Sequence, residues 1–288
     1  MNFILKINQE SCIACGRCVR ICTSKIFTQE GESKKIEIEN PENCISCGHC
    51  VAVCPTDSIT HSLFPASKLH AIKREKLPTA EQILLLCQSR RSNRAFSKVE
   101  IPVSTLDLIL EAAHRAPTAM NSQQVYFTLI TNPKDLQKIS KFTIDTFCGL
   151  MKKMEHPLLK PLLKPFLGGV YKMLPKFRKL KAEYDQGKDL ILRNATAVIL
   201  IHTPIESRFG CQDANLAYQN ASLMAESLCV GHFYMGFVCT AFQQDKKNKF
   251  IQSLGIKGKV HAAMALGMPE FMFTRYIDKQ DISVQKIK

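Results

Sequence analysis

The sequence contains no tryptophan and no apolar run long enough to cross a lipid bilayer. Its apolar runs are as short as AVILI at residues 197–201. The first residues, MNFILKINQE, lack the charged and then apolar layout of a secretion signal. These absences argue against a secreted or membrane-spanning protein, and we expect a cytoplasmic one.

Two further absences limit the possible ligands and partners. The 288 residues carry a formal net charge of +14, but no nucleic-acid-binding motif accompanies it, so we expect no nucleic-acid partner. No G-x-G-x-x-G follows a predicted strand, and the sequence therefore predicts no Rossmann site for a nicotinamide cofactor. Residues 1–60 hold six Lys/Arg and seven Asp/Glu, whereas the rest of the chain holds 33 and 18. This suits a basic body that binds anionic cofactors and an acidic partner or domain.

Cysteine, by contrast, is abundant. Thirteen cysteines without a secretion signal indicate thiolate chemistry in a reducing compartment and argue against disulfides. Eight of them form two runs of identical spacing, which are Cys12, Cys15, Cys18 and Cys22, and then Cys44, Cys47, Cys50 and Cys54. In a C-x2-C-x2-C-x3-C run, the first three thiolates hold three corners of one iron–sulfur cube and the fourth reaches the other cluster. Glycines at 16 and 48 allow the loops to turn tightly.

Residues 1–62 resemble the bacterial two-cluster ferredoxins on the strength of these runs and of Pro55, which follows the second. One [4Fe–4S] cluster is then expected on Cys12, Cys15, Cys18 and Cys54, and the other on Cys44, Cys47, Cys50 and Cys22. Thr23 stands where a proline usually follows the first run, which removes no ligand. Zinc is the alternative metal, but it does not explain two full four-cysteine runs.

The remainder of the chain is predicted to form a linker at 63–78 and a second domain at 79–288. Predicted capping boxes, Thr79 with Gln82 and Ser104 with Asp107, open helices at about 79–89 and 104–113. A further helix is predicted at about 211–229, and strands at 125–131, 196–203, 233–239 and 260–266. Helices and strands interleave, which indicates an α/β or α+β fold.

The motif RRSNRAF at residues 90–96 places Arg90, Arg91, Ser92 and Arg94 where a helix gives way to extended chain. Guanidinium forks and a hydroxyl suit a phosphate group. An arginine-rich helix end is also a common solvated surface, so the motif alone leaves both interpretations open.

A second motif, APTAMNSQQVYF at 116–127, favours the phosphate-binding interpretation. Together the two motifs resemble the nitroreductase family of FMN flavoproteins, over roughly residues 80–278. The resemblance includes DANLAYQNASLMAESLCVGHFYMGF at 213–237 and ALGMPEFMFTRY at 265–276. It implies an α+β, nitroreductase-like FMN domain that forms a homodimer, with a small ferredoxin-like domain before it.

The resemblance also implies roles for individual residues. Arg90, Ser92 and Arg275 would hold the FMN phosphate, Arg91 would add a contact, and Arg94 would reach the pyrimidine edge of the flavin. Thr118 and Asn121 would bind the flavin ring from the other subunit, and the strand end Gly236–Cys239 would face the flavin N5. Gln124 and Val125 replace a Pro-Trp pair common in the family.

Cys239 has two interpretations, a contact at the flavin or a small core thiol. We interpret Cys87, Cys148, Cys211 and Cys229 as core cysteines as well.

A basic insert occupies residues 150–184. Between 150 and 181 it carries nine Lys/Arg and one Glu, and prolines at 157, 161, 165 and 175 are predicted to divide it into short helical pieces. It could be a lid over the flavin or a dimer-embracing arm, a docking surface for an acidic electron donor, or an amphipathic segment on a membrane surface. We expect membrane association to be the weakest of these.

These features predict an iron–sulfur flavoprotein. Reduced ferredoxin, or a similar one-electron donor, would reduce the two clusters, and the clusters would reduce FMN. FMN would then reduce a small organic substrate such as a nitroaromatic or an enone. NAD(P)H is an alternative donor, since members of the family stack it directly on FMN. The chain could instead be an electron-transfer adaptor or redox sensor. Reductive dehalogenation and flavin breakdown are further possible outcomes on the same scaffold. No catalytic side chain is predicted.

Overall fold

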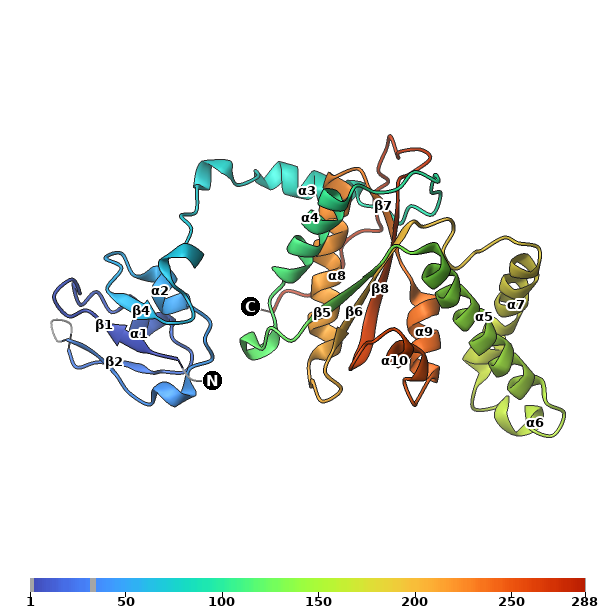
Figure 1. Ribbon diagram of the computed structural model, residues 1–288, viewed down its shortest axis with the longest axis horizontal. Coiled ribbons are helices and arrows are strands. Elements are labelled where there is room, and N and C mark those ends of the chain that lie inside the picture. The colour runs from blue at the N-terminus through green and yellow to red at the C-terminus, as the bar shows by residue number, and fades with distance from the viewer. Residues whose placement is uncertain (1–2, 32–34, 288) are drawn as a thin grey trace. The chain divides into compact units, whose positions relative to one another are not determined.

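The computed structural model describes residues 3–31 and 35–287. The chain divides into two compact units (Figure 1). The first comprises Met1–Pro78 with Ala119–Ser122, and the second comprises Thr79–Thr118 with Gln123–Lys288. Within the described ranges, no helix combines the length and apolar content needed to cross a membrane.

The first unit is small and built from short elements. These are α1 (Arg17–Ile21), α2 (His49–Val53), the antiparallel pair β1 (Leu5–Ile7) and β4 (Ile59–His61), and the antiparallel pair β2 (Phe27–Gln29) and β3 (Ile36–Ile38). Short 3-10 turns are η1 (Pro41–Asn43), η2 (Ala66–Lys68) and η3 (Arg74–Lys76). Ile26, Ile36 and Ile59 are buried between these elements together with Cys18 and Cys50. A unit of this size buries little apolar surface, so we expect groups bound by the cysteines to contribute to its stability.

The second unit is organised around a four-stranded antiparallel sheet. Its strands follow the order β5 (Tyr126–Ile130), β6 (Ala197–Thr203), β8 (Lys259–Gly267) and β7 (Gly231–Tyr234). Every residue of β6 is buried. Side chains alternate between the two faces of a strand, so a fully buried strand needs cover on both faces.

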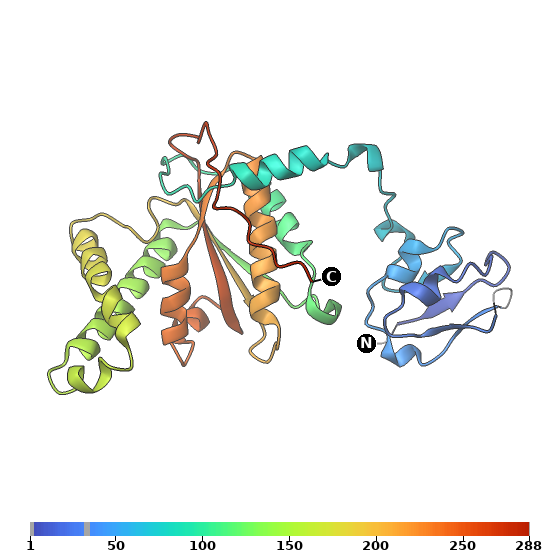
Figure 2. The same cartoon turned by 180° about the vertical axis from the view of Figure 1, so that it is seen from behind.

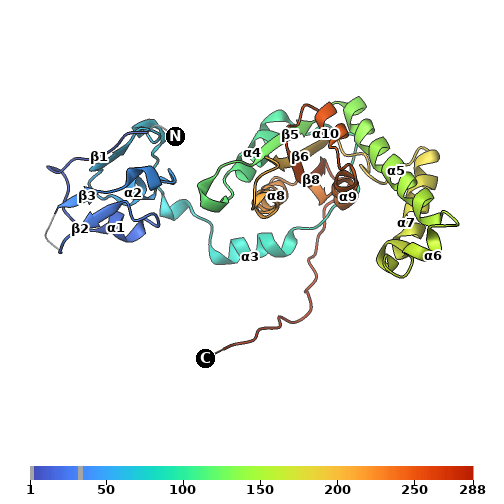
Figure 3. The same cartoon turned by 90° about the horizontal axis from the view of Figure 1, so that it is seen from below.

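Helices provide this cover. The helices of this unit are α3 (Ala80–Ser89), α4 (Val103–His114), α5 (Pro133–Glu155), α6 (Lys160–Leu163), α7 (Gly168–Asp185), α8 (Gly210–Ser227), α9 (Gly236–Gln244) and α10 (Lys249–Ser253). The 3-10 turn η4 (Ala119–Asn121) precedes β5 and belongs to the first unit. α4 and α8 lie on one face of the sheet and α5 and α9 on the other (Figure 3). Accordingly, Ile199 and Met264 belong to the core cluster beneath α8, whereas Leu200 and Ala263 belong to the cluster shared with α5 and α9.

The first predicted helix start is confirmed. Thr79 Oγ1 accepts a hydrogen bond from the Gln82 N–H at 3.2 Å, and Gln82 Oε1 accepts one from the Thr79 N–H at 2.9 Å. The second capping box was wrong, because α4 begins at Val103 behind Pro102, which leaves Ser104 inside the helix.

The predicted strand 233–239 was wrong beyond Tyr234. β7 ends at Tyr234, and Gly236 opens α9. Val238, Ala241 and Phe242 are buried at helical spacing on α9, a pattern that a short apolar run did not reveal.

The basic insert is more regular than its prolines predicted. α5 continues to Glu155, just before Pro157, and α7 passes through Pro175 without ending. Proline removes one helical hydrogen bond, but Leu174 and Phe177 are buried on either side of it and hold the helix in place. α7 lies beside α5, as Figure 2 shows from behind.

Candidate functional site

The eight cysteines of the first unit meet in two pockets. One pocket is lined by Cys12, Cys15, Cys18 and Cys54, and the other by Cys22, Cys44, Cys47 and Cys50. The fourth cysteine of each pocket thus comes from the opposite run. This is the crossed grouping that the spacing of the runs predicts.

The two cysteine loops repeat the same backbone geometry. Gly16 and Gly48 both have left-handed φ values, of 67° and 73°, and each precedes a short helix. Ala14 and Ser46 also share a positive φ of 51°. These turns direct successive thiols toward a common centre, because the chain reverses within each loop.

Backbone N–H groups point at two of the thiols. The Ser46 N–H donates to Cys44 Sγ and the Ser58 N–H donates to Cys54 Sγ, each at 3.3 Å. Burial alone would raise the pKa of Cys54, but hydrogen bonds from Thr56, Ser58 and Ile59 bring it below its usual value. Such donors favour the thiolate, which is the form that binds metal.

Other thiols have raised pKa values, because they are buried and lie close to one another. Burial and, to a smaller extent, the neighbouring thiols Cys44, Cys47 and Cys22 together raise the pKa of Cys50 to about 12. Burial also raises the pKa of Cys18. Four thiolates gathered in one pocket repel each other unless a cationic group lies between them. The quartets therefore fit a cationic metal–sulfur core.

His61 lies beside one of the cysteine loops, although no sequence pattern pointed to it. It is buried, stacks on Phe3 with 4.6 Å between ring centroids, and its Nδ1 accepts a hydrogen bond from the Leu63 N–H at 3.2 Å. The proton of the neutral ring is therefore on Nε2, which lies 4.0 Å from Cys44 Sγ. No motif could have indicated this contact, because it depends on how β4 lies against the cysteine loop.

The second unit contains a cavity of about 620 Å³ beside the sheet. A cavity of this size accommodates a small organic molecule. Its wall is formed by Arg94, Leu150, Gly169, Val170, Met173, Phe177, Leu190, Ile191, Arg193, Phe233, Tyr234, Met235, Gly236, Phe237, Val238, Thr240 and Gln244. The first turn of α9 lies on this wall, as do residues of α5 and α7 from the basic insert. The cavity is thus closed on one side by the insert.

The cavity brings together two parts of the sequence that were predicted to face the flavin, Arg94 and the stretch beginning at Gly236. The carbon at the centre of the Arg94 guanidinium lies 5.5 Å from the centroid of the Phe233 ring, a cation–π contact. Because Gly236 opens α9, the first N–H groups of this helix, which have no partner within the helix, lie at the cavity wall that also includes Arg94. The arrangement offers positive charge and N–H donors to an anionic, flat ligand.

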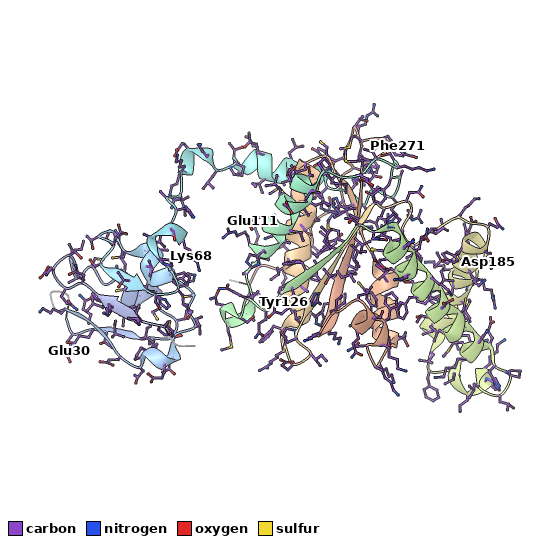
Figure 4. All side chains as sticks on the ribbon, viewed as in Figure 1. Glu30, Lys68, Glu111, Tyr126, Asp185 and Phe271 are labelled. Carbon is purple, nitrogen blue, oxygen red and sulfur yellow. The ribbon has the colours of Figure 1, made fainter. Side chains whose placement is uncertain are left out.

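Pairing with the segment after β8 fixes the loop that carries Arg94. Asn93 Nδ2 donates to the backbone oxygen of Phe271 at 3.2 Å, and the Ser97 N–H donates to that of Met268 at 2.8 Å. Phe271, labelled in Figure 4, is itself exposed. The position of this loop therefore rests on one side-chain and one backbone hydrogen bond to the backbone of the segment after β8.

Phe96 anchors the same loop in the core. A Cβ added to Gly267 would come 2.7 Å from Phe96 Cγ, and one added to Gly231 would come 2.9 Å from Phe96 Cε1. Only glycine at these two strand positions leaves room for the ring. The phenylalanine of RRSNRAF thus has a packing role that the sequence did not reveal.

Arg90, Arg91 and Ser92 are half-buried at the end of α3. Burial raises the pKa of Tyr218 to about 12, and the nearby guanidinium groups of Arg90 and Arg94 oppose that rise. Arg90 and Arg94 therefore share the neighbourhood of Tyr218. Arg275 is exposed on the segment after β8, and it does not line the cavity.

Thr118 and Asn121 lie in the turn before β5. Thr118 Oγ1 accepts a hydrogen bond from the Gln123 N–H at 2.9 Å. Within the first unit, Asn121 Nδ2 donates to the backbone oxygens of Ile45 at 3.2 Å and Ser46 at 2.9 Å. Neither side chain lines the cavity.

Cys239 is buried on the inner side of α9, and burial raises its pKa to about 11. A thiol with a raised pKa is unreactive at neutral pH, as a core cysteine is. The prediction of core positions was wrong for Cys87, Cys211 and Cys229, which are exposed, whereas Cys148 is half-buried. α3 has no buried residue at all, and the buried face of α8 is formed by residues such as Ala214 and Ala217.

Comparison with known proteins gives two family matches. Residues 87–268 match the nitroreductase family, and residues 11–58 match the 4Fe-4S dicluster domain. The second match agrees with the two crossed quartets and favours iron–sulfur clusters over zinc. The prediction of a two-cluster head before a nitroreductase-like α+β domain is confirmed. No protein with a curated description matches the chain.

Several solved structures share the fold of the second unit. A nitroreductase with bound FMN from Bacteroides fragilis is 20% identical, with a TM-score of 0.55 over 71% of this chain and 99% of its own. A nitroreductase with bound FMN from Desulfitobacterium hafniense is 19% identical, with a TM-score of 0.54 over 70% and 97%. A BluB-like flavoprotein from Clostridium difficile is 17% identical, with a TM-score of 0.51 over 68% and 94%.

Proposed function

Because the chain belongs to the nitroreductase family over most of its length, we propose that it is an iron–sulfur flavoprotein oxidoreductase. In this proposal, two [4Fe–4S] clusters in the first unit supply electrons to FMN in the second, and a small organic molecule is reduced. The observation that carries the proposal is that one chain contains two four-cysteine pockets and a large cavity with Arg94 beside a helix start.

The cysteine quartets are the proposed ligands of the clusters. Cys12, Cys15, Cys18 and Cys54 hold one cluster, and Cys22, Cys44, Cys47 and Cys50 hold the other. The N–H donors on Cys44 and Cys54 compensate part of the thiolate charge, and hydrogen bonds of this kind help to set the reduction potential of a cluster. A ferredoxin-like head with this pair of sites is suited to single-electron transfer.

FMN suits the donors at the cavity of the second unit. The guanidinium of Arg94 and the first N–H groups of α9 favour a flat ligand with negative charge, and none of the residues found to line the cavity is a carboxylate. When bound, FMN supplies the electron and hydride chemistry. The solved structures from Bacteroides fragilis and Desulfitobacterium hafniense hold FMN on the same fold.

Further residues are proposed to complete the FMN site. Arg90, Ser92 and Arg275 bind the phosphate, Arg91 adds a contact, and Thr118 and Asn121 reach the ring across a homodimer interface. All of them except Arg275 lie in the two motifs, within residues 87–268 that match the family. Arg275 follows the matched range, and its support is the resemblance of ALGMPEFMFTRY at 265–276. Cys239 contributes through the packing of α9 and not through a reactive thiolate.

An enzyme fits the cavity better than an electron-transfer adaptor does. The wall is mostly apolar and includes Leu150, Met173 and Phe177, so it excludes water around a bound small molecule. An adaptor that passed electrons to another protein would not need this volume. Reduced ferredoxin, or a similar one-electron protein, is the proposed donor, because the two clusters accept single electrons.

The proposal is tested with the full chain, loaded with iron, sulfide and FMN under anaerobic conditions. Reduced ferredoxin should bleach the cluster and flavin absorbance, and a nitroaromatic or an enone should restore the flavin absorbance. The control is the double variant Cys12→Ala, Cys44→Ala, which removes one ligand from each quartet. It should bind FMN but accept no electrons from ferredoxin.

Two results would contradict the proposal. If the double variant were reduced by ferredoxin at the rate of the unaltered protein, the clusters would not be the entry point. If no nitroaromatic or enone reoxidised the flavin while a partner protein did, the chain would be an adaptor.

A further inference from the structure

The cavity of the second unit contains a second cation, Arg193, that no motif assigns. It lies in the loop between α7 and β6, with a positive φ of 55°, and Asn194 follows with a φ of 63°. Two successive non-glycine residues in this conformation are uncommon, and they persist only where the surrounding structure holds them.

Asp189 holds this loop. Its Oδ1 accepts hydrogen bonds from the Ile191 N–H at 2.8 Å and the Leu192 N–H at 2.9 Å, and Ser140 Oγ on α5 donates to its Oδ2. The Arg193 N–H donates to the Asp189 backbone oxygen at 2.9 Å. Three hydrogen bonds within the loop and one to α5 therefore fix the backbone that carries Arg193, so the side chain starts from a defined position at the cavity wall.

The Arg193 guanidinium lacks a carboxylate partner of its own. None of the ion pairs found within residues 3–31 and 35–287 involves it. Burial lowers its pKa, and the positive charge of Arg94 lowers it further, while Asp189 acts in the opposite direction. An arginine stays protonated under such conditions, and a partly desolvated guanidinium without a directly paired carboxylate among the described residues favours an anion beside it.

The wall around Arg193 is apolar. Val170, Met173 and Phe177 come from α7, and Leu190 and Ile191 come from the loop itself. The Phe177 ring stacks on Phe147 with 4.3 Å between centroids, which fixes this part of the wall. A ligand that complements this cavity therefore needs an apolar body as well as a negative charge.

We propose that the substrate is an apolar, preferably aromatic, carboxylic acid whose carboxylate pairs with Arg193. Arg94 serves the flavin, as its place in the family motif requires, and Arg193, which lines the same cavity, serves the substrate. The inference rests on the proposed function, because it names the substrate class of that site. The basic insert then has a defined part, since α7 supplies the apolar wall.

The test compares two probes of nearly equal shape, 4-nitrobenzoate and 4-nitrobenzamide. Their dissociation constants are measured by titrating the oxidised, FMN-loaded full chain and following the flavin absorbance or the heat of binding. The unaltered protein should bind the acid about ten- to a hundred-fold more tightly than the amide, as expected for a charge-assisted pair. Arg193→Met should abolish this preference, and Arg193→Lys should keep part of it.

The matched control is Arg178→Met, also on the insert. Arg178 is exposed, pairs with Glu155 and does not line the cavity. This variant should keep the preference for the acid. Thermal unfolding and the FMN content of each variant show whether the site is intact, and Arg193→Lys provides the comparison if Arg193→Met does not fold.

Three results would overturn the inference. They are equal affinity of the unaltered protein for the two probes, a preference that survives Arg193→Met, or loss of FMN from both Arg193 variants, which would assign Arg193 to the cofactor. Failure of the proposed function has a different signature. If the acid binds through Arg193 but neither probe is ever reduced, the inference holds and the oxidoreductase proposal falls.

Discussion

The cysteine pockets of the first unit and the cavity of the second are assembled from the chain in different ways. Each cysteine pocket takes three of its thiols from one loop of seven residues, such as Cys12–Cys18, and one from the other run. The cavity takes its wall from segments between Arg94 and Gln244. A site on one short loop depends on local turns, whereas a site spread over the chain depends on how whole helices pack.

The largest effect is expected on iron content, in double variants that remove cysteines from one quartet or from both. Cys12→Ala with Cys54→Ala removes two ligands of one cluster and should leave about four iron atoms per chain, while Cys44→Ala with Cys54→Ala should leave almost none. Iron and sulfide analysis of anaerobic protein measures the difference, and Cys87→Ala, an exposed thiol, is the control. The opposite pattern would mean that each run holds its own cluster.

The dependence of the cavity on helix packing is tested at Phe177. Its side chain is 5% exposed and stacks on Phe147, so Phe177→Ala should lower the free energy of unfolding by about 3–5 kcal/mol. Phe166→Ala in the same insert removes a ring that is 83% exposed and should have little effect. Denaturant unfolding monitored by circular dichroism gives both values. Equal losses would show that α7 is not part of the packed unit.

Acid should weaken the second unit through His232. Burial lowers the pKa of His232 to about 4, so the folded state holds the neutral ring. Stability from this group is complete above the unfolded pKa of about 6.5 and is lost as pH falls through the folded pKa of about 4, by about 3 kcal/mol in total. His232→Gln should flatten this part of the stability curve, whereas His114→Gln on the surface should leave it unchanged. A curve for His232→Gln as steep as that of the unaltered protein would rule out this origin.

Removing the charge of Arg94 tests the flavin side of the cavity. Arg94→Met should raise the dissociation constant of FMN by about 10- to 100-fold, because one charge-assisted contact is lost. Lys98→Met changes an exposed cation in the same loop and serves as the control. Fluorescence titration of the apoprotein with FMN measures both. Unchanged affinity in Arg94→Met would remove Arg94 from the cofactor site.

The smallest expected effect concerns His61 in the first unit. Its Nε2–H faces Cys44, and the loss of a weak donor to sulfur should lower the potential of that cluster by about 20–40 mV in His61→Phe. His49→Phe, beside Cys50 but with no comparable contact to a thiol among the described residues, is the control. Anaerobic redox titration measures the shift. A rise in potential, or none, would contradict a donor role for His61.

The different construction of the two sites also explains what could be read from the sequence. The quartets follow from spacing alone, because a loop of this length can present its thiols in few ways. Arg94 was found through a motif, but its neighbour Arg193 was not, because an arginine before a strand carries no local signal. The prediction of a strand at 233–239 was wrong beyond Tyr234 for a related reason. An apolar run of seven residues does not distinguish a strand from the start of a helix.

Two interpretations of the sequence were incomplete because they depended on tertiary packing, which no sequence pattern contains. Pro175 was expected to end a helix, but packing of Leu174 and Phe177 against α5 outweighs the lost hydrogen bond. Phe96 was taken as part of a binding motif, and its role against Gly231 and Gly267 became clear only with the sheet in place.

We propose that electrons enter at the cysteine quartets and reach the flavin within one chain. This proposal is tested most directly by mixing reduced ferredoxin rapidly with the loaded protein and following the cluster and flavin absorbance separately. We expect the clusters to be reduced first and flavin reduction to follow at a rate independent of protein concentration. Flavin reduction that is as fast in the Cys12→Ala, Cys44→Ala variant, or that precedes reduction of the clusters, would contradict it.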